Sequence, residues 1–125
     1  MGLTKILKEY LAKGAKMPTA IFADDDMIAL GCIKAFQEAG YRVPEDISVA
    51  SFDDLPFCEI SSPRLTTIKV FKYEMGQIAV RRLIEVMKDG GKINTKTQVC
   101  TEFVERDSVI DFKLRLKRRR KLEDG

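Results

Sequence analysis

The chain has 125 residues, of which 45% are hydrophobic and 33% are charged, proportions typical of one soluble globular domain. It contains no histidine, which excludes Cys/His zinc sites and histidine-based catalysis, and its three cysteines are widely spaced. We therefore expect no metal, no cofactor, and reduced, buried thiols as in a cytoplasmic protein. Because no apolar run approaches the roughly 18 residues of a membrane span, we also expect no membrane contact.

The basic charge of the chain is concentrated at its C-terminus. The net charge is +3, from 22 basic and 19 acidic residues, and seven of the basic residues fall within Lys113–Lys121. With the two acids that follow, this segment carries +5, so the rest of the chain carries −2. We expect residues 112–125 to form a disordered, solvated tail. Clustered cations also bind phosphates, which leaves a nucleic-acid-binding arm as an alternative.

The first half of the chain predicts a helix followed by a strand, a helix and a strand. The first helix is amphipathic, with one apolar stripe of Leu3, Ile6, Leu7, Tyr10 and Leu11, and we expect it to cover one face of the sheet. Apolar runs at Thr19–Ala23 and Ile47–Phe52 predict strands. The segment Asp26–Ala39 between them has the period of a helix.

The second half continues the alternation of helices and strands. Residues Leu65–Val70 form either a third strand or an extended crossover, and both interpretations stay open. Tyr73–Lys88 predicts a long helix, and Gln98–Val104 alternates well enough for a strand. This order predicts an α/β fold with three layers, α/β/α, around a parallel sheet.

Aspartates follow each of the first two predicted strands. Asp24, Asp25 and Asp26 come after the first strand, and Asp53 and Asp54 come after the second. If the strands are parallel neighbours, both acidic clusters lie at the carboxyl edge of the sheet, where open α/β sheets bind ligands. Helix capping is the ordinary alternative for the first cluster. One capping residue is enough, however, so at least one acid is left for a ligand.

The helix at Asp26–Ala39 carries apolar residues on two sides. The side suited to packing on a sheet is formed by Ile28, Cys32, Ala35, Phe36 and Ala39. The opposite side carries Met27, Leu30 and Ile33, with Lys34 beside them. A second apolar side on an outer helix predicts a surface for a partner, and a merely apolar exposed helix is the alternative.

Several motifs follow one another along the chain. They are P-T-A-I-F-A at Pro18–Ala23, an acidic pair at Asp25-Asp26 with A-L-G at Ala29–Gly31, E-A-G-Y-R-V-P-E-D at Glu38–Asp46, S-V-A-S-F-D-D at Ser48–Asp54, P-R-L-T-T-I at Pro63–Ile68, G-Q-I-A at Gly76–Ala79 and V-E-R-D-S at Val104–Ser108. In order and spacing, the region Leu3–Ser108 closely resembles the LacI/GalR family of bacterial transcription repressors.

The resemblance implies a part of the effector-binding domain, whose two-lobed fold is shared with periplasmic sugar-binding proteins. Residues 1–64 would belong to the C-terminal lobe, 65–70 to the crossover, and 71–111 to the helix and strand that return towards an N-terminal lobe outside this chain. The helix-turn-helix domain through which such repressors bind DNA would also lie outside it. The family does not explain the basic tail.

The resemblance also implies which residues act. Asp53 matches a position that commonly hydrogen-bonds the effector, and Asp25 matches a cleft position that is more often Asn. The family's dimer contacts match Leu30, Ile33, Lys34 and the loop Phe57–Ser61, in agreement with the outer side of the helix, which adds Met27.

The implied function is sensing of a sugar-like small molecule and homodimerisation within a cytoplasmic repressor, without enzymatic activity. Because both lobes of such a domain form the cleft, we expect this part alone to bind the effector weakly. A fragment of a periplasmic-type sugar-binding protein is one alternative. Another is a phospho-receiver that uses its aspartates as a Mg²⁺ site, assisted by Thr66 or Thr67 and Lys69. The spacing of these residues does not suit a receiver.

Overall fold

The computed structural model describes residues 2–14 and 16–123, and within these the side chains of 2–4, 119, 122 and 123 lie outside the description. The predicted contact of Leu3 therefore falls outside the described part. The elements follow one another in the order α1 (Gly2–Ala12), β1 (Ala20–Phe22), α2 (Asp26–Glu38), β2 (Ser48–Asp53), α3 (Phe57–Ile60), β3 (Thr66–Lys69), α4 (Lys72–Asp89), β4 (Glu102–Val104) and α5 (Phe112–Glu123).

The four strands form one mixed sheet in the order β1-β2-β3-β4. Strands β1, β2 and β3 are parallel, with Phe22 opposite Ala50 and Asp53 opposite Lys69, whereas β4 pairs antiparallel with β3. The predicted α/β class is therefore confirmed, and Leu65–Val70 contains a strand that pairs in the sheet. The antiparallel β4 at the edge is the exception to the predicted parallel sheet.

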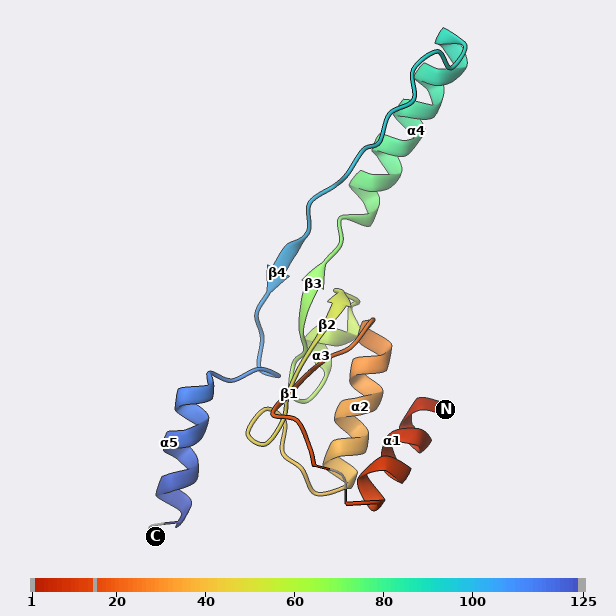
Figure 1. The fold of residues 1–125 in the computed structure, drawn as a ribbon. Coiled ribbons are helices and arrows are strands. Elements are labelled where there is room, and N and C mark those ends of the chain that lie inside the picture. The colour runs from red at the N-terminus through yellow and green to blue at the C-terminus, as the bar shows by residue number, and fades with distance from the viewer. Residues whose placement is uncertain (1, 15, 124–125) are drawn as a thin grey trace.

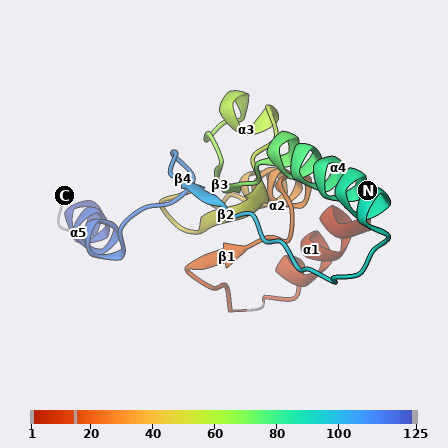
Figure 2. The same cartoon turned by 90° about the horizontal axis from the view of Figure 1, so that it is seen from above.

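Helices lie on both sides of this sheet, with α1 and α2 on one side and α5 on the other (Figures 1 and 2). The core forms between α2 and the parallel strands, where Phe36, Ile47, Val49 and Leu65 have at most 1% of their surface exposed. Burying each of these side chains contributes about 1.5–3 kcal/mol. Helix α1 packs beside α2, with Leu7 and Leu11 against the edge of the core, so it does not cover the sheet as expected.

Helix α4 projects away from the sheet, and the segment that follows it runs back alongside it (Figure 1). The Arg82 guanidinium joins the two, donating to the Thr95 hydroxyl and to the Ile93 carbonyl, each at 3.0 Å. No described residue of α4 is buried, and the apolar side chains of Tyr73, Leu83 and Met87 are 74%, 58% and 74% exposed. The periodicity thus predicts the helix correctly, while several apolar side chains of α4 are exposed in this structure. No helix among the described residues has the length and apolar character needed to cross a membrane.

Residues 112–123 are helical, which corrects the prediction of a disordered tail for this part, while residues 124 and 125 lie outside the described residues. The Asp111 carboxylate accepts hydrogen bonds from the amides of Lys113 and Leu114, at 2.7 and 3.3 Å, and so caps the start of α5. Lys and Arg have good helix propensity, and a buried anchor at Arg115 holds the helix on the sheet. The high charge density suggested disorder because it takes no account of the helix propensity of Lys and Arg or of the buried Arg115.

Candidate functional site

The carboxyl edge of the parallel strands gathers the acidic residues singled out by the sequence. Phe22 of β1 lies opposite Ala50 of β2. Asp25 is three residues after Phe22, and Asp53 is three residues after Ala50, so both aspartates lie at the same edge of the sheet. Strand β3 ends at this edge with Lys69, which lies opposite Asp53. The edge therefore combines carboxylates from two neighbouring strand ends with an amine from the third.

Asp53 has an unusual backbone conformation for a residue with a side chain. Its φ is +117°, and that of Asp54 is +58°, both in the region that favours glycine. Such strained positions persist only where surrounding contacts hold them, and they concentrate at functional sites. The Asp53 carboxylate is partly exposed and lies 3.5 Å from the Lys72 amine at the start of α4. It is thus accessible from the edge of the sheet.

Asp25 has a structural role that is visible in the geometry. It is the N-cap of α2, with an extended backbone, and its Oδ1 accepts the amide proton of Ile28 at 2.7 Å. The capping interpretation therefore applies to Asp25 itself, while a ligand contact by the same carboxylate stays a prediction. Asp24, directly before it, is exposed.

Asp26 is fully buried and joins three elements. Its Oδ1 accepts the hydroxyl protons of Ser51 at 2.5 Å and Thr67 at 2.7 Å, and its Oδ2 accepts the amide proton of Leu55 at 2.6 Å. Burial by itself raises the pKa of Asp26, but these hydrogen bonds outweigh it and leave the pKa below its ordinary value. By holding the Leu55 amide, Asp26 fixes the turn that contains Asp53.

A second buried network supports the same turn. The Arg106 guanidinium pairs with the Asp54 carboxylate at 2.8 Å and donates to the Leu65 carbonyl at 2.9 Å. The Ser108 hydroxyl donates to the Val49 carbonyl at 2.6 Å and accepts the Thr66 amide at 2.8 Å. These contacts bind the segment after β4 to strands β2 and β3. The motif at Val104–Ser108 was the sequence signal for them, but their role was not predicted.

These networks also bear on the receiver alternative, which needs an open acidic site facing Thr66 or Thr67. The Thr67 hydroxyl instead donates to the buried Asp26, and the Thr66 hydroxyl accepts the Arg106 amide at 2.9 Å. Within residues 2–14 and 16–123, no group of three or more Asp, Glu, Cys or His side chains is placed to hold a metal ion. Both threonines are used for structure.

The predicted dimer contacts divide into three groups. Met27 and Phe57 are 57% and 53% exposed, and Lys34 is exposed. Leu30 is half-buried against the core. Ser61 is also half-buried, and its hydroxyl donates to the carbonyl of Pro63 in its own loop. Ile33 is 4% exposed and belongs to the core, so its prediction as a surface contact is wrong.

The error at Ile33 has a physical cause. At 100° per residue, the buried side of α2 runs through Asp26, Ala29, Ile33 and Phe36, which are spaced three or four residues apart. The sequence pattern counts only apolar residues on the inner side of α2 and so leaves out Asp26. The predicted inner stripe is therefore rotated towards Ile28 and Ala39. Both sit less deeply in the structure, Ile28 half-buried and Ala39 exposed.

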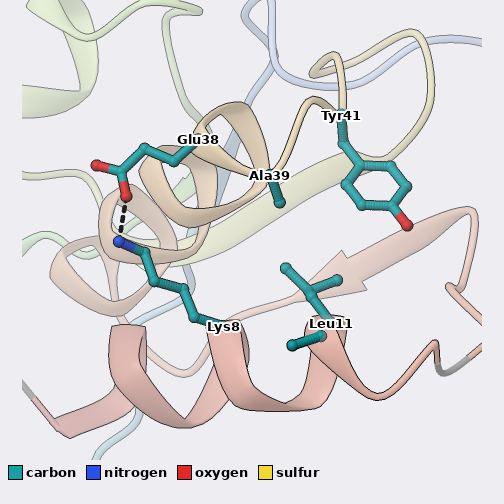
Figure 3. Close-up of a pocket in the computed structure, with 6 residues that line it drawn as sticks. Lys8, Leu11, Glu38, Ala39 and Tyr41 are labelled. Carbon is teal, nitrogen blue, oxygen red and sulfur yellow. Dashed lines mark ion pairs between the residues drawn. The ribbon is translucent and has the colours of Figure 1, made fainter.

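A shallow groove lies at the other end of α2, between α2 and α1. It has a volume of about 490 Å³ and is lined by Lys8, Leu11, Ala12, Glu38, Ala39 and Tyr41. The ion pair between Lys8 and Glu38 closes one side of it, while Tyr41 lies at the other (Figure 3). This groove is remote from the acidic edge, since Asp25 caps the opposite end of α2.

Comparison with known proteins places this geometry in a family. The family model described as "Periplasmic binding protein-like domain" matches residues 2–109. The HTH-type transcriptional repressor PurR of Vibrio cholerae serotype O1 is 40% identical over 97 residues, covering 78% of this chain and 29% of the relative. The HTH-type transcriptional regulator GalR of Streptococcus thermophilus is 35% identical over 104 residues, covering 83% and 31%. The chain thus spans about a third or less of the length of these curated relatives.

Solved structures agree with the sequence comparison. The lac repressor dimer bound to operator and the anti-inducer ONPF superposes with a TM-score of 0.79 at 31% identity, covering 87% of this chain and 37% of that chain. A sugar-binding transcriptional regulator of the LacI family from Escherichia coli, complexed with phosphate, gives 0.70 at 35% identity, covering 82% and 37%. The chain belongs to the periplasmic binding protein-like domain family and corresponds to part of the effector-binding domain of LacI/GalR-type transcription regulators.

Proposed function

We propose that the chain senses a small polar effector and dimerises, as part of a bacterial LacI-type transcriptional repressor. The observation that carries the proposal is the strained, partly exposed Asp53 at the carboxyl edge of the sheet, held in place by the two buried networks around it. The cytoplasmic location and the absence of enzymatic activity are parts of the same proposal.

The chemistry of the edge suits a hydroxylated ligand. An ionised carboxylate accepts hydrogen bonds only, so Asp53 can receive two hydroxyl protons of a sugar-like molecule. The Lys72 amine, 3.5 Å from Asp53, supplies donors for ring or hydroxyl oxygens of the same ligand. Among the solved neighbours, the lac repressor dimer is bound to the anti-inducer ONPF, and the LacI-family regulator from Escherichia coli is described as sugar-binding. We extend to this chain only their shared feature, a small polar molecule.

A ligand at this edge would act by selecting one arrangement of the domain. Asp53 is linked through Lys72 to the start of α4, the element that projects from the sheet. A ligand that competes for Asp53 changes this link, and so favours one orientation of α4 over another. In a repressor, that difference in free energy would be passed to DNA binding.

The ligand proposal is tested by calorimetry with D-galactose, D-ribose and guanine, each titrated into the chain and into two variants. Asp53→Asn should lower the affinity for the binding member of the panel at least tenfold, because it replaces a charged acceptor with a neutral amide. Asp24→Asn is the matched control, since it removes the same charge from an exposed residue at the same edge. Equal loss in both variants, or none in either, would contradict the assignment.

Dimerisation is proposed through one exposed surface, which we call the α2–α3 surface. It comprises Met27 and Lys34 of α2 with Phe57 and Ile60 of α3. Ile60 is 80% exposed, and the Gln37 side chain of α2 donates to the carbonyl of Ser62, two residues after α3, at 3.0 Å. Exposed apolar side chains gathered in this way are typical of interaction sites.

Sedimentation equilibrium tests this surface. Met27→Glu and Phe57→Glu should each shift the protein towards monomer, because each buries a charge in the interface. Leu83→Glu on the exposed side of α4 is the comparison, since Leu83 is apolar and 58% exposed as well. If only Leu83→Glu dissociates the dimer, the interface lies on α4 and this part of the proposal is wrong.

A further inference from the structure

Helix α5 is held on the sheet by one buried cation. The Arg115 side chain is only 4% exposed, and its guanidinium donates to the carbonyl of Thr19 at 2.7 Å, the carbonyl of Pro44 at 2.9 Å and the hydroxyl of Ser48 at 2.7 Å. Arg118, one turn further on, lies 3.8 Å from the Glu45 carboxylate. These contacts come from three segments of the body and fix the rotation of α5 about its axis.

This rotation directs a row of cations away from the body. At 100° per residue, Lys113, Lys117, Arg120 and Lys121 fall at about 140–240° from Arg115 around the helix. All four are exposed. We call these four residues the basic stripe. They recur at the spacing of one helix face, so the docked helix presents them together.

Within the described part of the chain, the stripe is not neutralised. Among the described residues, none of its four members forms an ion pair, whereas Arg118 on the inner side does. Lys113 and Lys117, and again Lys117 and Lys121, are like charges four residues apart, an arrangement that destabilises a helix by about 0.2–0.5 kcal/mol per pair. Arg115 fixes the orientation of α5 although the cations of the stripe repel one another. An external polyanion would relieve this repulsion, so we infer that the partner of the stripe is a polyanion.

The shape and composition of the stripe favour double-stranded DNA among the polyanions. It extends over nine residues, or about 12 Å along the helix axis, a length over which duplex DNA presents about seven phosphates. The aromatic residue of α5, Phe112, lies about 60° from Arg115 and so outside the stripe, whereas single-strand binders stack bases on several aromatic side chains. The apolar residues Phe112, Leu114 and Leu116 are spread around α5, so they do not form the single apolar side of a membrane-surface helix.

We propose that the basic stripe of α5 binds the phosphate backbone of duplex DNA without sequence preference. Arg115 positions the stripe, and the four stripe cations make the contacts. The inference does not depend on the proposed effector site, which lies at the other end of the parallel strands, because Thr19 and Ser48 precede β1 and begin β2.

Fluorescence anisotropy with a labelled duplex of about 30 base pairs tests the proposal on the 125-residue chain. Displacement of counterions from four phosphates predicts that log K falls with log salt at a slope of about −3.6, so each doubling of salt weakens binding about twelvefold. Two duplexes of unrelated sequence should bind equally. Replacing all four stripe cations with Gln, a good helix former, should abolish this binding, and Lys117→Gln alone should reduce the slope by about one.

Two matched variants separate position from total charge. Lys5, Lys88, Lys92 and Lys96 are exposed and lie on α1 and on or after α4, so their joint replacement by Gln removes the same charge elsewhere. This control should keep the slope. Replacing the three stripe lysines with Arg keeps the charge and should also keep it. Circular dichroism of each variant checks that α5 is still helical.

The outcomes that overturn the proposal are distinct. A control variant that loses as much affinity as the stripe variant would show that overall charge, not the stripe, binds DNA. Tighter binding to a single strand of the same length would point to a different nucleic-acid surface. Stronger binding to vesicles of phosphatidylcholine with 30% phosphatidylserine than to the duplex would make α5 a membrane-surface helix.

Discussion

Replacing Asp26 with Asn should destabilise the fold and loosen the turn that carries Asp53. The change is nearly isosteric, and the remaining oxygen can still accept the Ser51 and Thr67 hydroxyls, which share one oxygen of the carboxylate. The new NH₂ group then faces the Leu55 amide, so two donors meet where a donor met an acceptor. The result is a buried amide without a partner.

The magnitude follows from these contacts. An unpaired buried donor costs about 1–3 kcal/mol, and turning two charge-assisted hydrogen bonds into neutral ones costs about 1 kcal/mol each. The neutral amide is less costly to bury than the charged carboxylate, which offsets part of this loss. We therefore expect the free energy of unfolding to fall by about 3 kcal/mol. Urea denaturation followed by circular dichroism at pH 7 measures it. Asp25→Asn is the matched control, because Asn caps a helix as well as Asp does and should cost less than about 0.5 kcal/mol.

The same prediction has a pH dependence with a definite sign. The pKa of Asp26 lies below its ordinary value of 3.8 in the folded protein, so its ionised form stabilises the fold. This stabilisation is complete above the unfolded-state value and is lost as the pH falls through the lower folded-state value. The difference between wild type and Asp26→Asn should therefore shrink below about pH 4. Equal stability of the two Asn variants at pH 7 would refute the role given to Asp26.

Two further predictions concern buried groups. Arg106→Met should lower the free energy of unfolding by about 3–5 kcal/mol, because it leaves the Asp54 carboxylate buried without its partner. Thermal melts measure this change, and a loss below about 1 kcal/mol would contradict the prediction. Cys32 and Cys58 are buried as expected, but Cys100 is exposed, which corrects the expectation of buried thiols at that position. A thiol reagent at pH 8 should therefore label only Cys100 in the native protein, because burial together with Asp26 also raises the pKa of Cys58 to about 12. Rapid labelling of two or more thiols without denaturant would contradict this second prediction.

The first two strands and the main helices could be predicted because their signals are local, whereas the strand expected over Gln98–Val104 is formed only at Glu102–Val104. Pro18 and Gly40 bound apolar and periodic segments, and the observed ends of α2 and β2 differ by about one residue from those predicted. The parallel pairing of β1 with β2 follows from the crossover helix between them. The motifs also led correctly to the LacI/GalR family.

The central role of Asp26 could not be predicted because its partners are remote. Ser51 lies 25 positions away and Thr67 lies 41 positions away, on two different strands. From the sequence, Asp26 was one of three acids with equal claims to capping or ligand binding. Because the burial of Asp26 could not be predicted, the inner side of α2 was placed incorrectly and Ile33 was predicted at the surface.

The helix α5 shows the converse limitation. Its charge run was visible, but a buried Arg115 bonded to two backbone carbonyls leaves no trace in composition or periodicity. Only the folded body shows which way the remaining cations face. The order of the segment therefore depends on tertiary contacts that no local pattern records.

The most direct test of the central claim is to map the ligand on the chain by nuclear magnetic resonance. The backbone amide signals would be followed while D-galactose, D-ribose or guanine is added to millimolar concentration. We expect the largest shifts at the carboxyl edge of the sheet, at Asp53, Asp54 and Lys72, and we expect Asp53→Asn to remove them. Shifts confined to the groove around Lys8 and Tyr41, with Asp53 unaffected, would contradict it.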